Sequence, residues 1–412
     1  MSKALALLSG KGGSGKTTLA LSVASMLSSC YLKVLLIDCD LSTNGATYFY
    51  EEKLIREKNE IGSFYKIFID GEDKMGEFIK INEYMDFMPS ITKVTRANVE
   101  SYRFRTEDLN RIKKIDEQLR KKYDIIVYDC QAGYTDVLKL LLPHTDVNLV
   151  VMEADAISSA SIRSFYLKVG YLLNDKKIYQ IFNKATDEEY EIYSKISGGT
   201  VFTNIETIMF DWKIRKAFSV AQVPDIERTS ARYGEQIYNI SKILFNEEKI
   251  QKRLKKYDII IKLNKIQEKE KMLQQKLEQQ DIERKKAKNK LIKMLFTILI
   301  PAYIVMALSV FMEAIKNGQS FTGSDEKYVV LLTSATILIS ATLAVIFLGD
   351  ASRDIRSRSA QVNLYNKKLE KMLQQETKLE RQLKLMEKQE QTTLGSGTVN
   401  KITQGSGTVN KV

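Results

Sequence analysis

The sequence holds few of the residues that hydrolytic, zinc-dependent or disulfide-stabilised proteins need. Its 412 residues include one histidine, His144, and three cysteines, Cys30, Cys39 and Cys130. His144 follows Pro143 beside an apolar run, where we expect it to pack or lie at the surface rather than react. With no other histidine, zinc hydrolases and Ser-His-Asp triads are excluded. The cysteines show neither a zinc-binding spacing nor a disulfide framework, which predicts a reducing compartment.

Negative charge is also in short supply. Lysine and arginine number 63 against 51 acidic residues, which gives a formal net charge of +12 and an isoelectric point near 9.2. This balance favours a polyanionic partner, namely nucleic acid, anionic lipid or both. The chain opens directly on an apolar strand, so we expect no signal peptide, and its length allows more than one domain.

A glycine-rich loop lies between an apolar run and the start of a helical pattern. Its sequence is Ser9-Gly10-Lys11-Gly12-Gly13-Ser14-Gly15-Lys16-Thr17-Thr18. A phosphate-binding loop requires this order of strand, loop and helix, because the loop N–H groups and the helix N-terminus both point at the anion. Lys16 is expected to reach the β- and γ-phosphates and the Thr17 hydroxyl to ligate Mg²⁺. The residues expected to bind the nucleotide in this loop are Gly12, Gly13, Ser14, Gly15, Lys16, Thr17 and Thr18.

The second lysine of the loop, Lys11, completes the pattern KGGxGKT. This pattern resembles the deviant Walker A motif of the MinD/ParA family of dimerising ATPases. The resemblance implies ATP and Mg²⁺ as cofactors and a homodimer or higher homo-oligomer. It also implies that Lys11 reaches across the dimer to the partner's nucleotide and acts in catalysis with Lys16. An extra cation near the γ-phosphate stabilises the charged transition state of phosphoryl transfer.

Acidic residues follow two further apolar strands. Asp38 and Asp40 follow the second strand, and Asp129 ends the strand of residues 123–129. Open α/β sheets place their ligands at these carboxyl ends. By the resemblance, Asp38 and Asp129 belong with Thr17 at the Mg²⁺ site, and Asp40 is catalytic because it orients the attacking water. For Asp38 and Asp40, a pair of loop-capping aspartates remains the alternative.

The resemblance assigns three further residues. Asn44 belongs to a first switch, the Gly133 N–H senses the γ-phosphate, and Asn183 binds adenine. Family members usually carry two prolines where this chain has Cys130-Gln131-Ala132, which leaves the rate of hydrolysis open. Because residue 186 is Thr186, where a guanine-reading loop would have aspartate, ATP is preferred over GTP.

Apolar runs alternate with helical patterns over residues 1–246. This alternation predicts a doubly wound, mostly parallel α/β sheet, the fold of a P-loop NTPase domain. Residues 84–88 are an expected strand, and residues 147–156 are an expected strand and loop. Residues 214–244 resemble the closing loop and last helix of the family domain, so the resemblance covers about the first three-fifths of the chain.

Two long uncharged runs, residues 295–312 and 328–349, follow in the second half of the chain. They predict a transmembrane hairpin over residues 291–350, with spans at about 294–313 and 328–349. Two buried helices of a soluble protein are the alternative. Basic residues flank both outer ends, so the positive-inside rule places the N- and C-terminal parts in the cytoplasm and the chain in the cell inner membrane. Membrane lipid then accounts for the basic charge, and nucleic acid is not required as a partner.

Residues 247–290 and 351–391 have the composition and spacing of a helical stalk or coiled coil. The seam positions are Ile259, Leu263, Ile266, Leu273 and Leu277, and Val362, Leu369, Met372, Leu379, Leu383 and Met386. An amphipathic helix packed on the ATPase domain is the alternative for the first segment. The sequence KMLQQ occurs at 271–275 and again at 371–375, each about 20 residues from a span. The two segments therefore match in height and could pair as an antiparallel stalk, unless the similarity is chance.

The C-terminal tail, residues 392–412, repeats GSGTVNK at 395–401 and 405–411. Such a tail could add a strand to the sheet edge of an unknown partner protein. A disordered tail is equally compatible with this composition.

Together these features predict a membrane-anchored ATPase of the MinD/ParA type. Its ATP-dependent dimerisation would signal to the membrane hairpin or a partner, and antiviral defence is one setting that no residue specifies. The alternative is a membrane-tethered DNA- or plasmid-partition ATPase that uses Arg215, Lys216 and Arg232. A bacterial tyrosine kinase fits less well, because no tyrosine cluster follows Tyr365. A pore or scaffold gated by ATP is a fourth reading.

Overall fold

The computed structural model describes residues 2–57, 60–71, 75–92, 102–173, 176–195, 202–223, 231–316 and 325–403. The chain divides into two compact units. Unit 1 comprises Met1–Asn264 with Gln382–Val412, and unit 2 comprises Lys265–Arg381.

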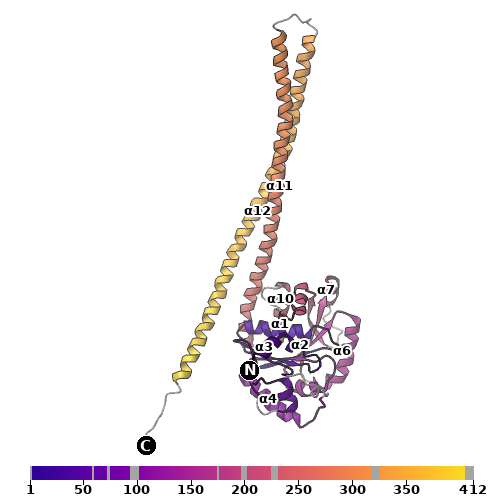
Figure 1. The fold of residues 1–412 in the computed structure, drawn as a ribbon, viewed down its shortest axis with the longest axis vertical. Coiled ribbons are helices and arrows are strands. Elements are labelled where there is room, and N and C mark those ends of the chain that lie inside the picture. Colours follow the sequence, from indigo (N-terminus) through magenta and orange to yellow (C-terminus); the bar gives the residue numbers. More distant parts are fainter. Residues whose placement is uncertain are drawn as a thin grey trace. The chain divides into compact units, whose positions relative to one another are not determined.

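Unit 1 is built on an eight-stranded sheet (Figure 1). The strands are β1 (Lys3–Leu8), β2 (Val34–Cys39), β3 (Ile79–Asn82), β4 (Met85–Met88), β5 (Ile125–Cys130), β6 (Val147–Glu153), β7 (Lys177–Ala185) and β8 (Thr203–Met209). Their order across the sheet is β3-β4-β2-β5-β1-β6-β7-β8. Every neighbouring pair is parallel except β3 and β4. The predicted mostly parallel α/β fold is confirmed, and β3 and β8 are strands that the sequence analysis did not predict.

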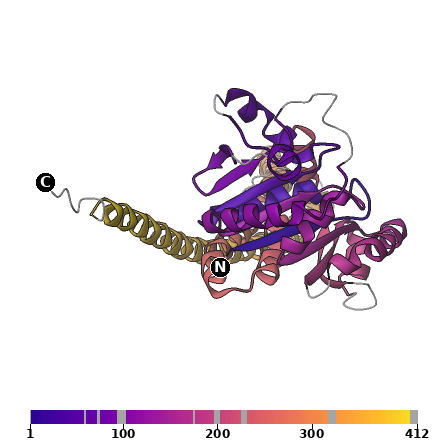
Figure 2. The ribbon, with the colours of Figure 1, turned by 90° about the horizontal axis from the view of Figure 1, so that it is seen from below.

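Helices cover both faces of this sheet. They are α1 (Lys16–Ser29), α2 (Gly45–Phe49), α3 (Glu51–Arg56), η1 (Tyr65–Asp70), α4 (Asp108–Lys122), α5 (Asp136–Leu141), η3 (Leu142–His144), α6 (Ala156–Val169), η4 (Gly170–Leu172), α7 (Asp187–Tyr193), α8 (Trp212–Ser219) and α10 (Ala231–Leu244). Two longer helices follow, α11 (Glu248–Lys316) and α12 (Asp325–Thr403). In Figures 1 and 2 the strands lie between helices, with α1 and α10 on one side of the sheet and α4 on the other.

The two faces of the sheet bury separate apolar layers, because successive side chains of a strand point to opposite sides. On β1, Leu5 and Leu7 pack with α1 and α10, whereas Ala6 and Leu8 pack with α4, α5 and α6. All of these β1 side chains are fully buried. Because strands buried on both faces are apolar throughout, the central strands were readable from sequence.

Unit 1 extends beyond the domain boundary predicted at residue 246 and reaches Asn264. The first turns of α11 bury Ile250, Leu254, Tyr257 and Ile261 in the same apolar layer as α1. The start of the predicted stalk therefore packs on the α/β domain, as in the alternative of an amphipathic helix.

Unit 2 consists of most of α11 and the first part of α12. Both predicted uncharged runs lie in these helices. Among the described residues, Glu248–Met306 is the one helical segment long and apolar enough to cross a membrane, judged by length and composition, and none of its apolar window is buried in the protein. The second span stays a prediction.

Polar contacts join α11 to α12 within unit 2. Gln267 Nε2 donates to Glu376 Oε1 over 2.9 Å, and Arg358 forms an ion pair with Glu283. These contacts run antiparallel and enclose the KMLQQ segments at 271–275 and 371–375. The coiled coil remains a prediction. The first GSGTVNK copy is helical within α12, where a strand-forming or disordered tail was expected, and the second copy lies outside the described residues.

Candidate functional site

The phosphate-binding loop connects β1 to α1 as predicted. Gly15 precedes the helix with φ of 93°, and Gly13 has φ of 83°, a region that disfavours side chains. A Cβ on Gly15 would lie 2.3 Å from Asn183 Nδ2. The loop therefore needs glycine at this position, both for its backbone angle and for the close approach of β7.

A cavity of about 460 Å³ opens above this loop, which is within the usual range for a small-molecule site. It is lined by predicted site residues Gly12, Gly13, Gly15, Lys16, Thr17, Thr18, Asp40 and Asn183. Four other predicted residues, Lys11, Ser14, Asp38 and Asp129, do not line it.

Asp38 and Asp129 are partners in the parallel register of β2 and β5. Both are buried, at 0% and 1% exposure. Asp38 Oδ2 accepts from the Thr47 backbone N–H over 2.8 Å and from the Thr47 hydroxyl over 2.7 Å. Neither carboxylate oxygen of Asp129 has a hydrogen-bond partner in the described part of the chain.

Burial raises the pKa of Asp38, and the neighbouring Asp129 charge raises it further. Burial also raises the pKa of Asp129, against the opposing effect of Lys16. Two buried carboxyls with two free oxygens are the donor set that a hard divalent cation prefers. The site therefore fits Mg²⁺, which Asp129 and Thr17 would hold. Asp38 is the register partner of Asp129, and its oxygens accept from Thr47 and from the Asp40 N–H.

Asp40 is held by its own loop. Its Oδ1 accepts from the Ser42 hydroxyl over 2.7 Å, and its Oδ2 accepts from the Thr43 hydroxyl over 2.7 Å. Burial acts to raise the pKa of Asp40, but the hydrogen bonds from Thr43 and Ser42 outweigh it, so the pKa is lowered and the group is ionised. In this arrangement Asp40 caps a turn at the cavity wall.

The segment after Asp40 is tied to the end of β4 through a residue that the sequence analysis missed. Ser90 donates to Asn44 Oδ1 over 2.7 Å and lies 3.0 Å from the Thr47 hydroxyl. Asn44 itself has φ of 51°. This chain of hydrogen bonds runs from the predicted first switch to Asp38. Serine and threonine carry no spacing signal that could have identified the link.

The Gly133 N–H donates to the Ser9 carbonyl over 2.8 Å. It was expected to meet the γ-phosphate, so in this structure the amide is already engaged. Gln131 and Ala132, which replace the family's prolines, line the cavity.

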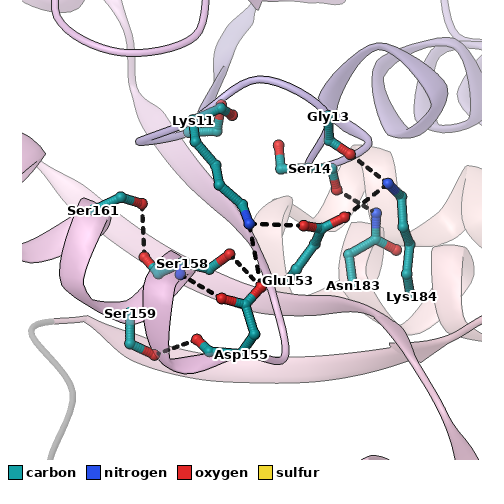
Figure 3. A network of polar contacts seen from close by, with 11 residues as sticks. Lys11, Gly13, Ser14, Glu153, Asp155, Ser158, Ser159, Ser161, Asn183 and Lys184 are labelled. Carbon is teal, nitrogen blue, oxygen red and sulfur yellow. Dashed lines mark hydrogen bonds and ion pairs between the residues drawn. The ribbon is translucent and has the colours of Figure 1, made fainter.

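Lys11 lies at the centre of an ionic network drawn in Figure 3. Its Nζ is 3.0 Å from Glu153 Oε2 and 3.3 Å from Asp155 Oδ2. The hydrogen bond to Glu153 raises the pKa of Lys11, so the lysine stays charged. Asp155 also caps α6, since its Oδ1 accepts from the Ser158 N–H over 2.6 Å. These contacts hold Lys11 outside its own nucleotide cavity.

Asn183 and Lys184, at the end of β7, form hydrogen bonds to the backbone of the phosphate-binding loop (Figure 3). Asn183 Nδ2 donates to the Ser14 carbonyl over 2.8 Å. Lys184 donates to the Gly13 carbonyl and forms an ion pair with Glu153 over 2.9 Å. The sequence analysis assigned Asn183 to adenine and gave Lys184 no role. Lys184 has a left-handed φ of 60°, which no sequence pattern predicted.

The outer wall of the cavity comes from β8, α8 and α10, to which the sequence analysis gave no role in the nucleotide site. Phe210, Asp211, Ile214, Arg215 and Phe218 belong to this wall. The sequence analysis did not recognise β8, and it named only Arg215 among these residues, as a candidate for DNA binding. His144 and the three cysteines do not line the cavity.

A glycine loop at a strand-to-helix junction, with two buried aspartates on neighbouring parallel strands, defines a P-loop nucleotide-binding domain. A family model described as an AAA domain matches residues 2–181. Sporulation initiation inhibitor protein Soj of Bacillus subtilis is 30% identical over 132 residues, which are 32% of this chain and 50% of Soj. Septum site-determining protein MinD of the same organism is 23% identical over 157 residues, 37% of this chain and 53% of MinD.

A crystal structure of a putative plasmid partition protein from Borrelia burgdorferi, bound to AMPPNP, shares the fold with a TM-score of 0.51 and 23% identity. It covers 59% of this chain and 98% of that protein. This chain spans about half the length of the first curated relatives that it matches. The N-terminal part of the chain is a P-loop domain that is similar in sequence to proteins of the MinD/ParA type.

Proposed function

We propose that the protein is a membrane-anchored, ATP-dependent dimerisation switch that hydrolyses ATP to ADP and phosphate. The observation that carries this proposal is the position of Lys11. A lysine of the phosphate-binding loop that pairs with Glu153 and Asp155 at the protein surface, outside its own cavity, is free to exchange those partners for a second subunit's nucleotide.

Different residues of each subunit have separate roles in binding and hydrolysing ATP. Lys16 and the N–H groups of the loop bind the phosphates, and Asp40 orients the attacking water once it leaves Ser42 and Thr43. Lys11 adds positive charge to the partner's γ-phosphate as negative charge develops there. Mg²⁺, when bound beside Asp129, neutralises phosphate charge.

The membrane anchor rests on the apolar segment of α11 and the matching uncharged run in α12. If both span the bilayer, unit 1 and the stalk share the cytoplasmic side with ATP. Closing and reopening of the dimer would then be passed along the stalk to the hairpin or to a partner bound at the tail.

The test is the size of the detergent-purified full chain with ADP, with ATP, and with ATP for Lys16→Ala. We expect ATP alone to raise the molar mass to a dimer or larger, and Lys16→Ala to prevent this. Lys11→Ala should still bind ATP and remain a monomer. An unchanged mass with ATP contradicts the proposal.

A second candidate is a partition-type ATPase that binds DNA. It is supported by the net charge of +12 and by the likeness to a protein named for chromosome partitioning, ParA of Myxococcus xanthus, which is 29% identical over 122 residues. Arg215 in α8 is one of its candidate residues. DNA binding that requires ATP and weakens with salt would favour this function, and no binding at low salt would exclude it.

A further inference from the structure

Basic residues follow one another where α11 approaches its apolar segment. We call five of them the lysine collar: Lys285, Lys286, Lys288, Lys290 and Lys293. No acidic residue lies between Glu283 and Glu313. All five lysines are exposed, and among the residues that the structure describes none of them takes part in an ion pair. The collar is therefore a group of cations without counter-charges.

The collar covers more than half of the circumference of the helix. At about 100° per residue, Lys286, Lys290 and Lys293 lie within about 60° of one another, and Lys285 and Lys288 extend the charge to an arc of about 200°. A helix that lies flat in a membrane surface keeps its charges on one face and its apolar residues on the other. Charge over more than half of the circumference, followed directly by an uncharged stretch, is the pattern of a helix that leaves a polar layer and enters hydrocarbon.

The next level of α11 is apolar all around. Residues 294–312 carry no charge, and none of the apolar window is covered by the rest of the protein. Phe296, Tyr303 and Leu308 are exposed by 61%, 69% and 56%. Monomeric soluble proteins rarely expose an apolar surface of this extent, so hydrocarbon is the solvent that suits it. The collar then lies at the depth of the lipid headgroups.

Among the described side chains of α12, no acidic residue pairs with the collar. Arg358 reaches across to Glu283 and also pairs with Asp354 over 3.0 Å. These contacts place Arg358 of α12 near the collar. The charge of Arg358 is already paired with Glu283 and Asp354 inside the hairpin. The positive charges of the collar lysines are therefore available to an external anion.

We infer that the lysine collar binds the headgroups of anionic phospholipids and gives the hairpin a preference for acidic lipid. The inference rests on the proposed membrane anchor. Lysine near an acidic leaflet attracts phosphate-bearing headgroups, whereas zwitterionic headgroups carry no net charge to attract.

The experiment measures lipid selectivity of the full chain in phosphatidylcholine bilayers. Spin-labelled phosphatidylglycerol or spin-labelled phosphatidylcholine is added, and the motionally restricted fraction of each label gives their relative association constants. We expect the wild type to favour phosphatidylglycerol by about fivefold or more. The attraction of a single lysine to an acidic surface accounts for a preference of this size. The preference should fall as salt is raised.

The collar variant carries Lys285→Gln, Lys286→Gln, Lys288→Gln and Lys290→Gln. A matched control removes the same charge from exposed stalk positions, through Lys367→Gln, Lys368→Gln, Lys371→Gln and Lys378→Gln. The collar variant should lose most of the selectivity, and the control should keep it.

Equal association of the two lipids with the wild type overturns the inference, as does full selectivity in the collar variant. A chain that a carbonate wash removes from the bilayer overturns the membrane anchor itself, and this is seen before any lipid is compared. If the collar variant loses binding to duplex DNA in detergent while keeping its lipid selectivity, the collar binds DNA and the lipid assignment is wrong.

Discussion

Lys11 Nζ lies 3.0 Å from Glu153 Oε2, and this ion pair joins the phosphate-binding loop to the end of β6. Glu153 also accepts from Lys184, which in turn holds the Gly13 carbonyl. One carboxylate thus connects two lysines and the backbone of the loop. Any nucleotide that draws Lys11 toward a second subunit must compete with it.

Glu153→Gln is expected to ease dimerisation, because it removes the charge that retains Lys11 in the free subunit. The ATP concentration that gives half-maximal dimer should fall by about two- to fivefold, as expected for a partly exposed ion pair. Analytical ultracentrifugation over an ATP titration measures this. Glu83→Gln, which removes an exposed carboxylate elsewhere on unit 1, should leave the midpoint unchanged. A higher midpoint for Glu153→Gln would mean that Glu153 supports the dimer.

Gly15→Ala is expected to destabilise unit 1 even without nucleotide. Its φ of 93° disfavours a side chain, and the added Cβ would meet Asn183 Nδ2 at 2.3 Å. The free energy of unfolding should fall by about 2 kcal/mol. Gly12→Ala is the matched control, because a Cβ there meets nothing within 4 Å. Calorimetric scans without nucleotide compare the two variants, and equal stability would contradict the loop geometry.

Asp129→Asn is expected to stabilise the metal-free domain while it removes hydrolysis. The carboxyl is buried with no hydrogen-bond partner, and burial raises its pKa. A carboxyl whose folded-state pKa is raised stabilises the fold below its ordinary pKa of about 4, and this stability is lost as pH rises through the raised value. The metal-free wild type should therefore become less stable between about pH 4 and pH 6, the value to which burial raises the pKa of Asp129.

Hydrogen exchange of the β5 amides in the presence of a chelator follows this loss, because these amides report unfolding of unit 1. In Asp129→Asn the pH dependence should be flatter, and stability at the upper end of the range should be higher by about 1 kcal/mol. Asp70→Asn, an exposed change, should behave as the wild type. A steeper pH dependence in Asp129→Asn would rule out the buried carboxyl as its source.

Glu270→Gln is expected to stabilise the stalk in unit 2. Glu270 is 9% exposed, and burial raises its pKa, with a further contribution from Glu376 across the hairpin. Removing one of two facing carboxyls relieves their repulsion, so amides near Gln267 should exchange more slowly at neutral pH. The wild-type stalk should itself exchange more slowly as pH falls through the raised pKa of Glu270, once the intrinsic pH dependence of exchange is corrected.

The control for the stalk is Glu268→Gln. Glu268 is exposed and two residues away, so its exchange should match the wild type. Faster exchange in Glu270→Gln would show that Glu270 supports the hairpin through a contact instead of opposing it.

The sequence alone determined the parts of this protein that depend on local pattern. The run of glycines before Lys16, the acidic residues after apolar strands and the change of composition after residue 246 each follow from neighbours along the chain. Backbone sterics and hydrophobic periodicity act over a few residues, so their effects can be predicted without a structure. The phosphate-binding loop and the parallel sheet were predictable for this reason.

Only the tertiary structure decided which distant groups meet. Lys11 and Glu153 are 142 positions apart, and no periodicity relates them. The meeting of Ser90 with Asn44, and the burial of Tyr257 beneath an α/β domain that was expected to end earlier, have the same origin. Strand order brings these residues together, and strand order is set by packing of the whole sheet, which pairwise sequence spacing does not encode.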